Sequence, residues 1–337
     1  MTHAGTQPID TKRLILRRFT EADLPDMLKN WIADPAVQQE YGEPCYPDVE
    51  SAGALLHKWI ASYESPAFYR WAIIERESGQ NIGQIAFCRV YDDVKTAEIE
   101  YCISRAFRGR GYAGEALQAV IADTFTQTDF EKLEAYHRAE NITSGRVLEK
   151  SAMHRTDSVE RFRRAGEQSK GEVCYCIRRD GMNYPGITED FIRSCAHYGI
   201  RYAPDAPYCY RVLMKLIYEN DWARARQLLE ANPQAFADKH RWIVLDTAVG
   251  MCLNEVTDRQ GNLYRTESGM KKGKTYYPAP ECIAFIAYLL ENGADPHQPE
   301  RFDQLKNIDD TESDSAQQTG FHYDCSAVRA LLKQYWK

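Results

Sequence analysis

The sequence predicts two domains: an α+β domain with a mixed β-sheet flanked by helices, and a second, all-α domain. At 337 residues the chain is about twice the usual size of a domain. Before Pro185, short alternating segments typical of strands separate two or three helical segments, whereas most later hydrophobic segments have helical spacing. We place the first domain at residues 1–181, a linker at 182–206 and the second domain at 207–337.

The composition is that of a globular protein without a membrane segment. Hydrophobic residues make up 44% and charged residues 27%, which argues against a disordered chain. No apolar stretch approaches the roughly 20 residues that cross a bilayer, and a signal peptide is not evident. We therefore expect a cytoplasmic protein. The formal net charge of -7 argues against general binding to nucleic acid or anionic membranes. The scattered cysteines lack metal-ligand spacing, so we expect reduced thiols and no metal site.

The first domain opens with a strand, a helix and a hairpin. Apolar and charged residues alternate over 12–19, as in a half-buried strand. Thr20 and Asp23 have the spacing of a capping box, which predicts a helix directly after them. Two strand-like segments, 68–76 and 82–91, flank a turn that contains Ser-Gly, and they predict a hairpin.

The rest of this domain alternates strands and helices. The predicted elements are a strand at 96–104, a helix at 114–128, a strand at 132–137, a helix at 141–153 and two closing strands at 158–164 and 172–179. This order predicts a mixed sheet.

A glycine-rich turn, FRGRGYAGEAL, follows the strand at 96–104 and contains G-x-G-x-x-G at Gly109, Gly111 and Gly114. A dinucleotide fingerprint would need an acid at the end of the next strand, which instead ends in His137. A triphosphate loop would need Gly-Lys-Ser/Thr, which is absent. A strand that leads through glycines into a helix N-terminus binds phosphate. The glycines alone fit a loop beside a surface helix equally well.

The neighbouring residues favour the phosphate interpretation. The segment AEIEYCISRAFRGRGYAGEAL resembles the acetyl-CoA motif of the GNAT acetyltransferase superfamily, Arg/Gln-x-x-Gly-x-Gly/Ala after a strand, which falls on Arg108, Gly111 and Ala113. NITSGRVLEKSAM resembles the family's downstream helix, although Ala152 stands where glycine is usual. TKRLILRRFTEADLPDMLKNW resembles the opening of the branch that contains ribosomal-protein N-terminal acetyltransferases. The resemblance covers about residues 8–181 and implies a GNAT-like fold.

The resemblance implies an acetyl-CoA site, with acetyl-CoA as co-substrate and no metal. The pyrophosphate would lie on backbone N–H groups of the glycine-rich turn, and the pantetheine arm would pair like an added strand. A helix N-cap would explain Asn141 as well as a contact with the arm does. The implied cofactor-binding residues are Ile103, Ser104, Arg108, Gly109, Arg110, Gly111, Tyr112, Ala113, Gly114 and Asn141.

Transfer to an amine requires a base, because the amine is largely protonated at neutral pH. The resemblance places the family's general-base glutamate at Glu98, with Glu100 nominally on the same strand face. Strand glutamates are otherwise more often solvated. Ser144 is the candidate acid for the departing thiolate, with Tyr101 and Tyr136 in reserve, although helix capping explains Ser144 equally well.

The acceptor site is expected in an aromatic and acidic loop over residues 30–50, where this branch of the family contacts its acceptor. Trp31, Tyr41 and Tyr46 are the predicted substrate-binding residues, and Glu43 adds negative charge that would suit an amine. Loops are also polar by default. The acceptor amine is a small molecule or a protein N-terminus, and the sequence does not choose between them.

The second half predicts helical pairs that resemble degenerate ankyrin repeats. Helices are expected within 208–236, 242–253, 280–297 and 324–336, with a polar interruption at 254–278 and a flexible acidic loop at 309–320. LLENGADP resembles the ending of an ankyrin repeat, and RQLLEANP echoes it in imperfect register. Such stacks bind proteins, so a protein partner is implied, while covering the first domain and self-association stay open.

The leading hypothesis is an acetyl-CoA-dependent N-acetyltransferase that transfers the acetyl group directly to a primary amine with general-base assistance. The alternative is a noncatalytic acyl-CoA-binding adaptor that acts through its ankyrin-like half. Release of free thiol from acetyl-CoA across a panel of amines separates the two.

Overall fold

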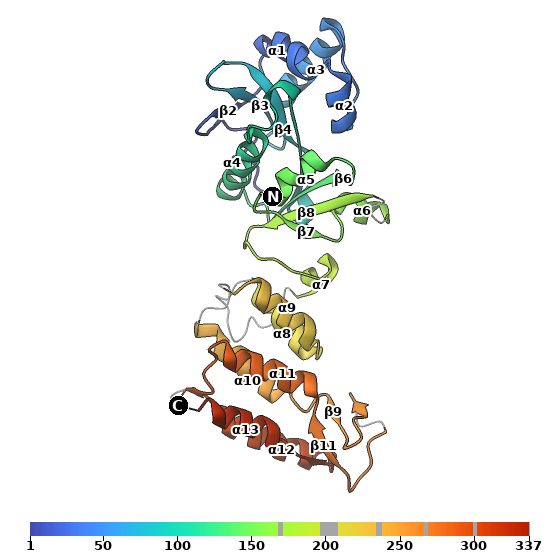
Figure 1. Cartoon of the computed structure of the whole chain (residues 1–337), viewed down its shortest axis with the longest axis vertical. Helices are drawn as coiled ribbons and strands as arrows, with labels where there is room; N and C mark the ends of the chain where they lie inside the picture. Colours follow the sequence, from blue (N-terminus) through green and yellow to red (C-terminus); the bar gives the residue numbers. More distant parts are fainter. Residues whose placement is uncertain (168–170, 196–207, 234–237, 266–268, 299–301, 337) are drawn as a thin grey trace. The chain divides into compact units, whose positions relative to one another are not determined.

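The computed structural model describes residues 1–167, 171–195, 208–233, 238–265, 269–298 and 302–336. The chain forms two compact units, Met1–Gly181 and Met182–Lys337 (Figure 1). Much of the predicted linker, 196–206, lies outside the described residues, and its earlier part holds helix α7 (Glu189–Ser194). Within the described ranges, no helix combines the length and apolar character needed to span a membrane.

The first unit contains an eight-stranded mixed sheet, as predicted (Figure 1). The strand order is β1-β2-β3-β4-β5-β6-β8-β7, and β5 and β6 form its one parallel pair within the described residues. The strands are β1 (Ile9–Asp10), β2 (Leu14–Arg17), β3 (Arg70–Glu75), β4 (Asn81–Tyr91), β5 (Thr96–Ile103), β6 (Lys132–Arg138), β7 (His154–Thr156) and β8 (Glu172–Arg178).

Helices cover both faces of this sheet. One core joins the apolar stripe of α4 to the sheet, and a second core lies on the opposite face against α1 and α3. The helices are α1 (Leu24–Asn30), α2 (Pro35–Tyr41), α3 (Val49–Ser62), α4 (Tyr112–Gln127), α5 (Ile142–Glu149) and α6 (Glu160–Ala165), with 3-10 turns η1 (Glu21–Asp23), η2 (Asp92–Val94) and η3 (Arg105–Phe107).

Strand β5 divides its side chains between the two faces. Ile99 and Ile103 are buried in the α4 core, whereas Cys102 belongs to the core on the other face. Because side chains alternate along a strand, Glu98 and Glu100 share the face of Cys102. The side chains of Glu98 and Glu100 therefore lie on the face of the sheet opposite to α4.

The parallel strands β5 and β6 separate after three paired residues. Their register joins Thr96 to Lys132 and Glu98 to Glu134, and no later pair links them within the described residues. Strand β5 stays paired with β4, which carries a bulge between Phe87 and Arg89, while β6 stays paired with β8. A bulge bends and twists a strand, so the sheet opens into a gap at this point.

Most of the predicted elements of the first unit are confirmed, including the hairpin β3–β4, strands β5, β6 and β8, and helices α4 and α5. The predicted capping box also forms: the N–H of Thr20 donates to the Asp23 carboxylate at 2.7 Å.

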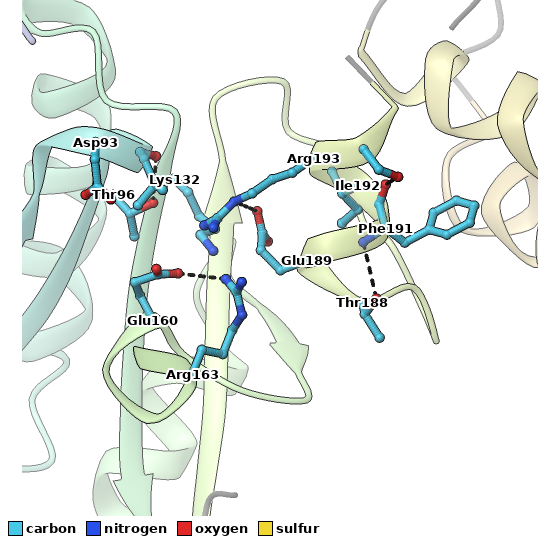
Figure 2. Close-up of polar contacts among 12 residues, drawn as sticks. Asp93, Thr96, Lys132, Glu160, Arg163, Thr188, Glu189, Phe191, Ile192 and Arg193 are labelled. Carbon is cyan, nitrogen blue, oxygen red and sulfur yellow. Dashed lines mark hydrogen bonds and ion pairs between the residues drawn. The ribbon is translucent and has the colours of Figure 1, made fainter. Parts of the chain in front are cut away.

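The predicted closing strand at 158–164 is wrong, because this segment contains helix α6. Its start is fixed by a tertiary contact, in which the N–H of Glu160 donates to the Glu134 carboxylate at 2.7 Å. Glu160 also bonds Arg163 at 2.7 Å, one turn later (Figure 2). Val159 and Phe162 are both buried, and their spacing of three residues is that of one face of a helix. The segment therefore folds as a helix although its sequence also alternates like a strand.

The predicted loop at 30–50 contains helix α2, which corrects that prediction. The Asp34 carboxylate accepts the N–H of Ala36 at 2.9 Å, and Pro35 occupies the first helical position. Gly42 ends the helix in a left-handed conformation, with φ +87°. Tyr41 is the last residue of helix α2 and lies toward the sheet.

The second unit is mainly helical, but short strands correct the prediction of an all-α domain. A four-stranded sheet, in the order β10-β9-β11-β14, occupies much of the predicted polar interruption. Its helices are α7, α8 (Tyr208–Tyr218), α9 (Trp222–Ala231), α10 (Asp238–Gly250), α11 (Pro280–Glu291), α12 (Gln304–Thr319) and α13 (Ser326–Gln334), and its strands are β9 (Val256–Thr257), β10 (Leu263–Tyr264), β11 (Thr275–Pro278), β12 (His297–Gln298), β13 (Phe302–Asp303) and β14 (His322–Tyr323).

Local contacts shape two segments of the second unit. The predicted flexible loop at 309–320 is instead largely helix α12, because Arg329 from α13 bonds Asp309 at 2.8 Å and Glu312 at 2.5 Å. Helix α7 begins where the Thr188 hydroxyl accepts the N–H of Phe191 at 3.3 Å (Figure 2).

Gly83 is required by close contact between β4 and β5. A Cβ at this position would lie 2.1 Å from the backbone oxygen of Cys102. We expect Gly83→Ala to destabilise the first unit by about 3 kcal/mol because the strands must move apart. Thermal unfolding measures this change. Gly53→Ala in helix α3 is the control, because its Cβ would be in ordinary contact, 3.6 Å from Leu24, and alanine favours helix. Equal stability of the Gly83 variant and the parent would contradict the close contact.

Candidate active site

A cavity of about 1400 Å³ occupies the gap between β5 and β6. Its lining includes Tyr101 and Ser144 from the α4 and α5 side of the sheet, and Glu98 and Glu100 from the opposite face. Since side chains from both faces line one space, the cavity passes through the sheet where the strands separate.

The glycine-rich turn lies at the cavity and leads into α4. Gly109 and Gly111 have φ angles of +77° and +82°, which L side chains rarely adopt. Among the described residues, no side chain caps the start of α4, and a Cβ at Gly109 or Gly114 would meet no atom within 4 Å. The first N–H groups of the helix therefore border open space, as the phosphates of acetyl-CoA require.

The two arginines of the turn differ in role. Arg108 braces the backbone, because its Nε donates to the Ile103 oxygen at 3.1 Å and its guanidinium bonds Glu40 at 2.6 Å. The guanidinium of Arg110 lies outside the cavity lining, over the ring of Phe107 and 3.9 Å from the Glu75 carboxylate, and its side chain is 54% exposed.

The other predicted cofactor-binding residues border or support this space. Ile103, Ala113 and Gly114 line the cavity, as does Tyr112, whose hydroxyl donates to Glu75 at 2.5 Å and anchors α4. Ser104 is buried outside the cavity lining, and its N–H donates to the Ile82 oxygen at 2.8 Å.

Asn141 and Ser144 are joined at the start of α5. The Asn141 side chain accepts the N–H of Ser144 at 3.1 Å, so it acts as a helix N-cap. The Ser144 hydroxyl lies 3.0 Å from the hydroxyl of Tyr101, one of the reserve candidates for the acid. Burial raises the pKa of Tyr101, which keeps its proton at neutral pH. Both hydroxyl groups border the cavity.

Glu98 is 1% exposed and lines the cavity from β5. Its Oε1 accepts hydrogen bonds from Arg89 at 2.7 Å and from the Cys88 thiol at 3.1 Å. Its Oε2 has no hydrogen-bond partner among the described residues. A buried carboxylate that is held by one oxygen and unpaired at the other is suited to accept a proton.

Glu100 is engaged in an ion pair with Arg70 at 3.0 Å. Arg70 also donates to Gln84 and lies over the ring of Trp59, 4.4 Å from its centroid. The Tyr41 hydroxyl accepts a hydrogen bond from Gln84 at 2.9 Å, and burial together with the charge of Glu100 raises the pKa of Tyr41. Tyr41 therefore lies in the cavity as a neutral phenol.

Two of the predicted acceptor residues do not line the cavity. Trp31 is 1% exposed, its indole donates to Asn81 at 2.8 Å, and its ring stacks on Trp59. Tyr46 packs against the same core. Trp31 lies in the core rather than in the cavity lining, because its hydrophobic ring and its N–H are both satisfied inside the protein.

Sequence reasoning missed several cavity residues. Arg70 and Arg161 were not singled out, since their approach to the cavity depends on cross-strand register and on helix α6. Glu43 lines the cavity, and burial and the charge of Glu100 raise its pKa. Within the described part of the chain, no group of three His, Cys, Asp or Glu residues could hold a metal ion.

The raised pKa of Glu43 predicts a pH-dependent effect on stability. Because folding disfavours its charge, we expect Glu43→Gln to raise the melting temperature at pH 7 by about 1–2 °C, a small shift because solvent screens this partly exposed group. The gain disappears below the ordinary glutamate pKa of 4.5, where the carboxyl is neutral in both states. Glu64→Gln, at an exposed position outside the cavity lining, is the control for thermal scans at both pH values. A gain that persists at pH 4 would contradict this origin.

The family model described as "Acetyltransferase (GNAT) domain" matches residues 13–154. The chain is 30% identical to an uncharacterized N-acetyltransferase, p20 of Bacillus licheniformis, over 164 residues that make up 48% of this chain and 89% of that protein. It is 27% identical to the uncharacterized N-acetyltransferase YnaD of Bacillus subtilis over 175 residues, 52% of this chain and 99% of that protein. A similar solved structure is Mycobacterium smegmatis RimJ in complex with CoA-disulfide, with 20% identity and a TM-score of 0.45 over 53% of this chain and 90% of that one. The chain therefore belongs to the GNAT acetyltransferase family and is an acetyl-transferring enzyme.

Proposed function

We propose that the enzyme transfers the acetyl group of acetyl-CoA directly to a primary amine, with Glu98 as the general base. The observation that carries this proposal is the unpaired, buried Oε2 of Glu98, a glutamate that lines the cavity between β5 and β6. An amine that enters on the face of Glu98 can meet a thioester that enters beside Ser144, since both residues line one space.

Acetyl-CoA supplies the acetyl group as a thioester, and several groups are suited to hold it. The open N–H groups at the start of α4 suit its pyrophosphate, and Arg110 adds an accessible cation. The free edge of β5, up to Ile103, suits the amide-rich arm. Because Asn141 caps α5, we assign it a supporting role beside the arm.

The proposed transfer requires the protonated amine to lose two protons and the thiolate to gain one. Glu98 takes the first proton from the ammonium group, and the neutral nitrogen then bonds the acetyl carbon. The nitrogen releases its second proton to solvent as the carbon–sulfur bond breaks. Ser144 gives its hydroxyl proton to the sulfur, and Tyr101 at 3.0 Å is placed to replace it. Both carboxylates are in ion pairs, Glu100 with Arg70 and Glu98 with Arg89. Glu100 is the less favoured base, because Glu98 is the more deeply buried of the two and keeps an Oε2 without a hydrogen-bond partner among the described residues.

Release of free thiol from acetyl-CoA, measured across a panel of primary amines, tests the proposal. We expect thiol release that depends on the amine, together with an acetylated amine detected by mass spectrometry. Thiol release without an acetylated amine, or no release with any amine, would contradict direct N-acetyl transfer.

We further propose that the second unit binds a protein partner, as its resemblance to degenerate ankyrin repeats implies. Helices α8 and α9 form an adjacent pair with buried apolar faces, which is the architecture of a helical repeat. A photo-crosslinker at the exposed Tyr218 of the full-length chain tests it. Cross-links to one stoichiometric protein would support the role, whereas cross-links between copies of this chain would indicate self-association instead.

A further inference from the structure

The charged groups on the acceptor face of the cavity are mostly paired. Arg70 bonds Glu100 at 3.0 Å, and Arg89 bonds Glu98 at 2.7 Å. Glu43 and Arg161 also line this space and make no ion pair among the described residues. An acceptor on this face therefore meets the Glu43 carboxylate and the guanidinium groups of Arg161 and of Arg138, two residues beyond Tyr136 on β6, none of which is in an ion pair among the described residues.

Arg161 differs from the neighbouring arginines of α6. Arg163 and Arg164 bond the Glu160 carboxylate at 2.7 Å and 3.0 Å. Arg161 instead donates to the Tyr136 hydroxyl and lies over the ring of Phe162, 5.6 Å from its centroid. The phenol of Tyr136 and the ring of Phe162 hold the guanidinium of Arg161 in place, but neither carries a negative charge. The charge of Arg161 therefore stays available to an anion in the cavity.

Tyr136 connects Arg161 with the proposed base. Burial and the charge of Glu98 raise the pKa of Tyr136, while Arg161 opposes the shift. Both charges therefore act on the same hydroxyl group, although they come from β5 and α6. The parallel register supports this arrangement, because Glu98 pairs with Glu134 and Tyr136 lies two residues further along β6 on the same face.

We infer that the acceptor carries a carboxylate next to the amine that is acetylated, as a free amino acid does, and that Arg161 binds this carboxylate. The inference rests on the proposed function. A guanidinium binds a carboxylate through two parallel hydrogen bonds, which would orient the adjacent amine toward the open oxygen of Glu98. Glu43 lies in the field of Glu100 and repels a carboxylate, which favours binding on the β6 side. A protein N-terminus has a neutral amide in place of this anion.

Matched pairs of amino acids and their carboxamides test the inference. Thiol release from acetyl-CoA gives kcat/KM for each member, together with a short peptide that presents a free N-terminus. In the best pair, we expect kcat/KM for the acid to be about 10- to 100-fold higher than kcat/KM for its amide. This range corresponds to one charge-assisted hydrogen bond. Arg161→Gln should remove this preference mainly through KM for the acid, and Arg161→Lys should restore part of it.

Arg164→Gln is the matched control, because Arg164 lies on the same helix but outside the cavity lining. It should keep the preference for the acid, and both Gln variants should bind acetyl-CoA in calorimetry as the parent does. A parent enzyme that acetylates amides or peptides as well as acids would overturn the inference and leave the proposed function intact, as would an unchanged preference in Arg161→Gln. If Arg161→Gln fails to fold, the inference is decided by the parent enzyme, from the ratio of kcat/KM for the acid to kcat/KM for its amide. Absence of transfer to any amine would refute the proposed function itself.

Discussion

Gly111→Val should weaken binding of acetyl-CoA by about 100-fold. A left-handed residue costs roughly 1–3 kcal/mol when it is not glycine, and relaxation of the turn would also displace the N–H groups that face the phosphates. Gly111 has a φ angle of +82° and begins α4, so it cannot relax without moving the helix start. Isothermal titration of the purified variant with acetyl-CoA measures the loss.

Gly79→Val separates strain from ligand binding. Gly79 also has a positive φ, +69°, but it lies in the β3–β4 hairpin outside the cavity lining. Both variants should lose stability, and only the Gly111 variant should lose affinity. Full affinity in a folded Gly111→Val protein would show that the phosphates bind elsewhere.

Glu98→Gln should lower turnover by about 100-fold or more at neutral pH, which is the usual contribution of a positioned base. The amide keeps the size of the side chain but cannot accept the amine proton. Because a larger fraction of the amine is unprotonated at higher pH, the defect should shrink as the pH rises toward the pKa of the acceptor. A pH profile of steady-state kcat measures both effects.

Two further substitutions make this result specific to Glu98. Glu149→Gln changes an exposed glutamate of α5 that bonds Arg155 outside the cavity lining, and it should leave turnover unchanged. Glu100→Gln should have the smaller effect of the two cavity substitutions, because Glu98 is the more deeply buried carboxylate and keeps an unpaired oxygen. If Glu100→Gln abolished turnover while Glu98→Gln retained it at every pH, the two assignments would be reversed.

Local patterns were sufficient to predict much of the first unit. Alternation predicted the hairpin and strand β5, and the glycines between a strand and an amphipathic helix predicted the turn before α4. These features depend on contacts within a few residues and on backbone angles that glycine alone adopts readily. The resemblance to the family singled out Glu98, Ser144 and Tyr41 as candidates, and all three side chains line the cavity.

Local patterns failed where distant segments determine the outcome. The segment at 158–164 alternates like a strand, yet Glu134 binds its first N–H and it becomes helix α6. Trp31 lies in a segment expected to contact the acceptor, yet Asn81 and Trp59 hold it in the core. In both cases a partner about 26 to 50 residues away decides the structure.

The sequence alone determined the family, the glycine turn and the residue types available for acyl transfer, since these are written in short contiguous motifs. The tertiary structure decided which charged groups meet in the cavity. Divergence of β5 from β6 opens the cavity, and the folding of α6 brings Arg161 to Tyr136 there. Charge pairing depends on distance in space, which sequence separation does not report. Only the folded chain therefore shows that Arg161 bonds a neutral phenol and that the buried Oε2 of Glu98 has no partner among the described residues.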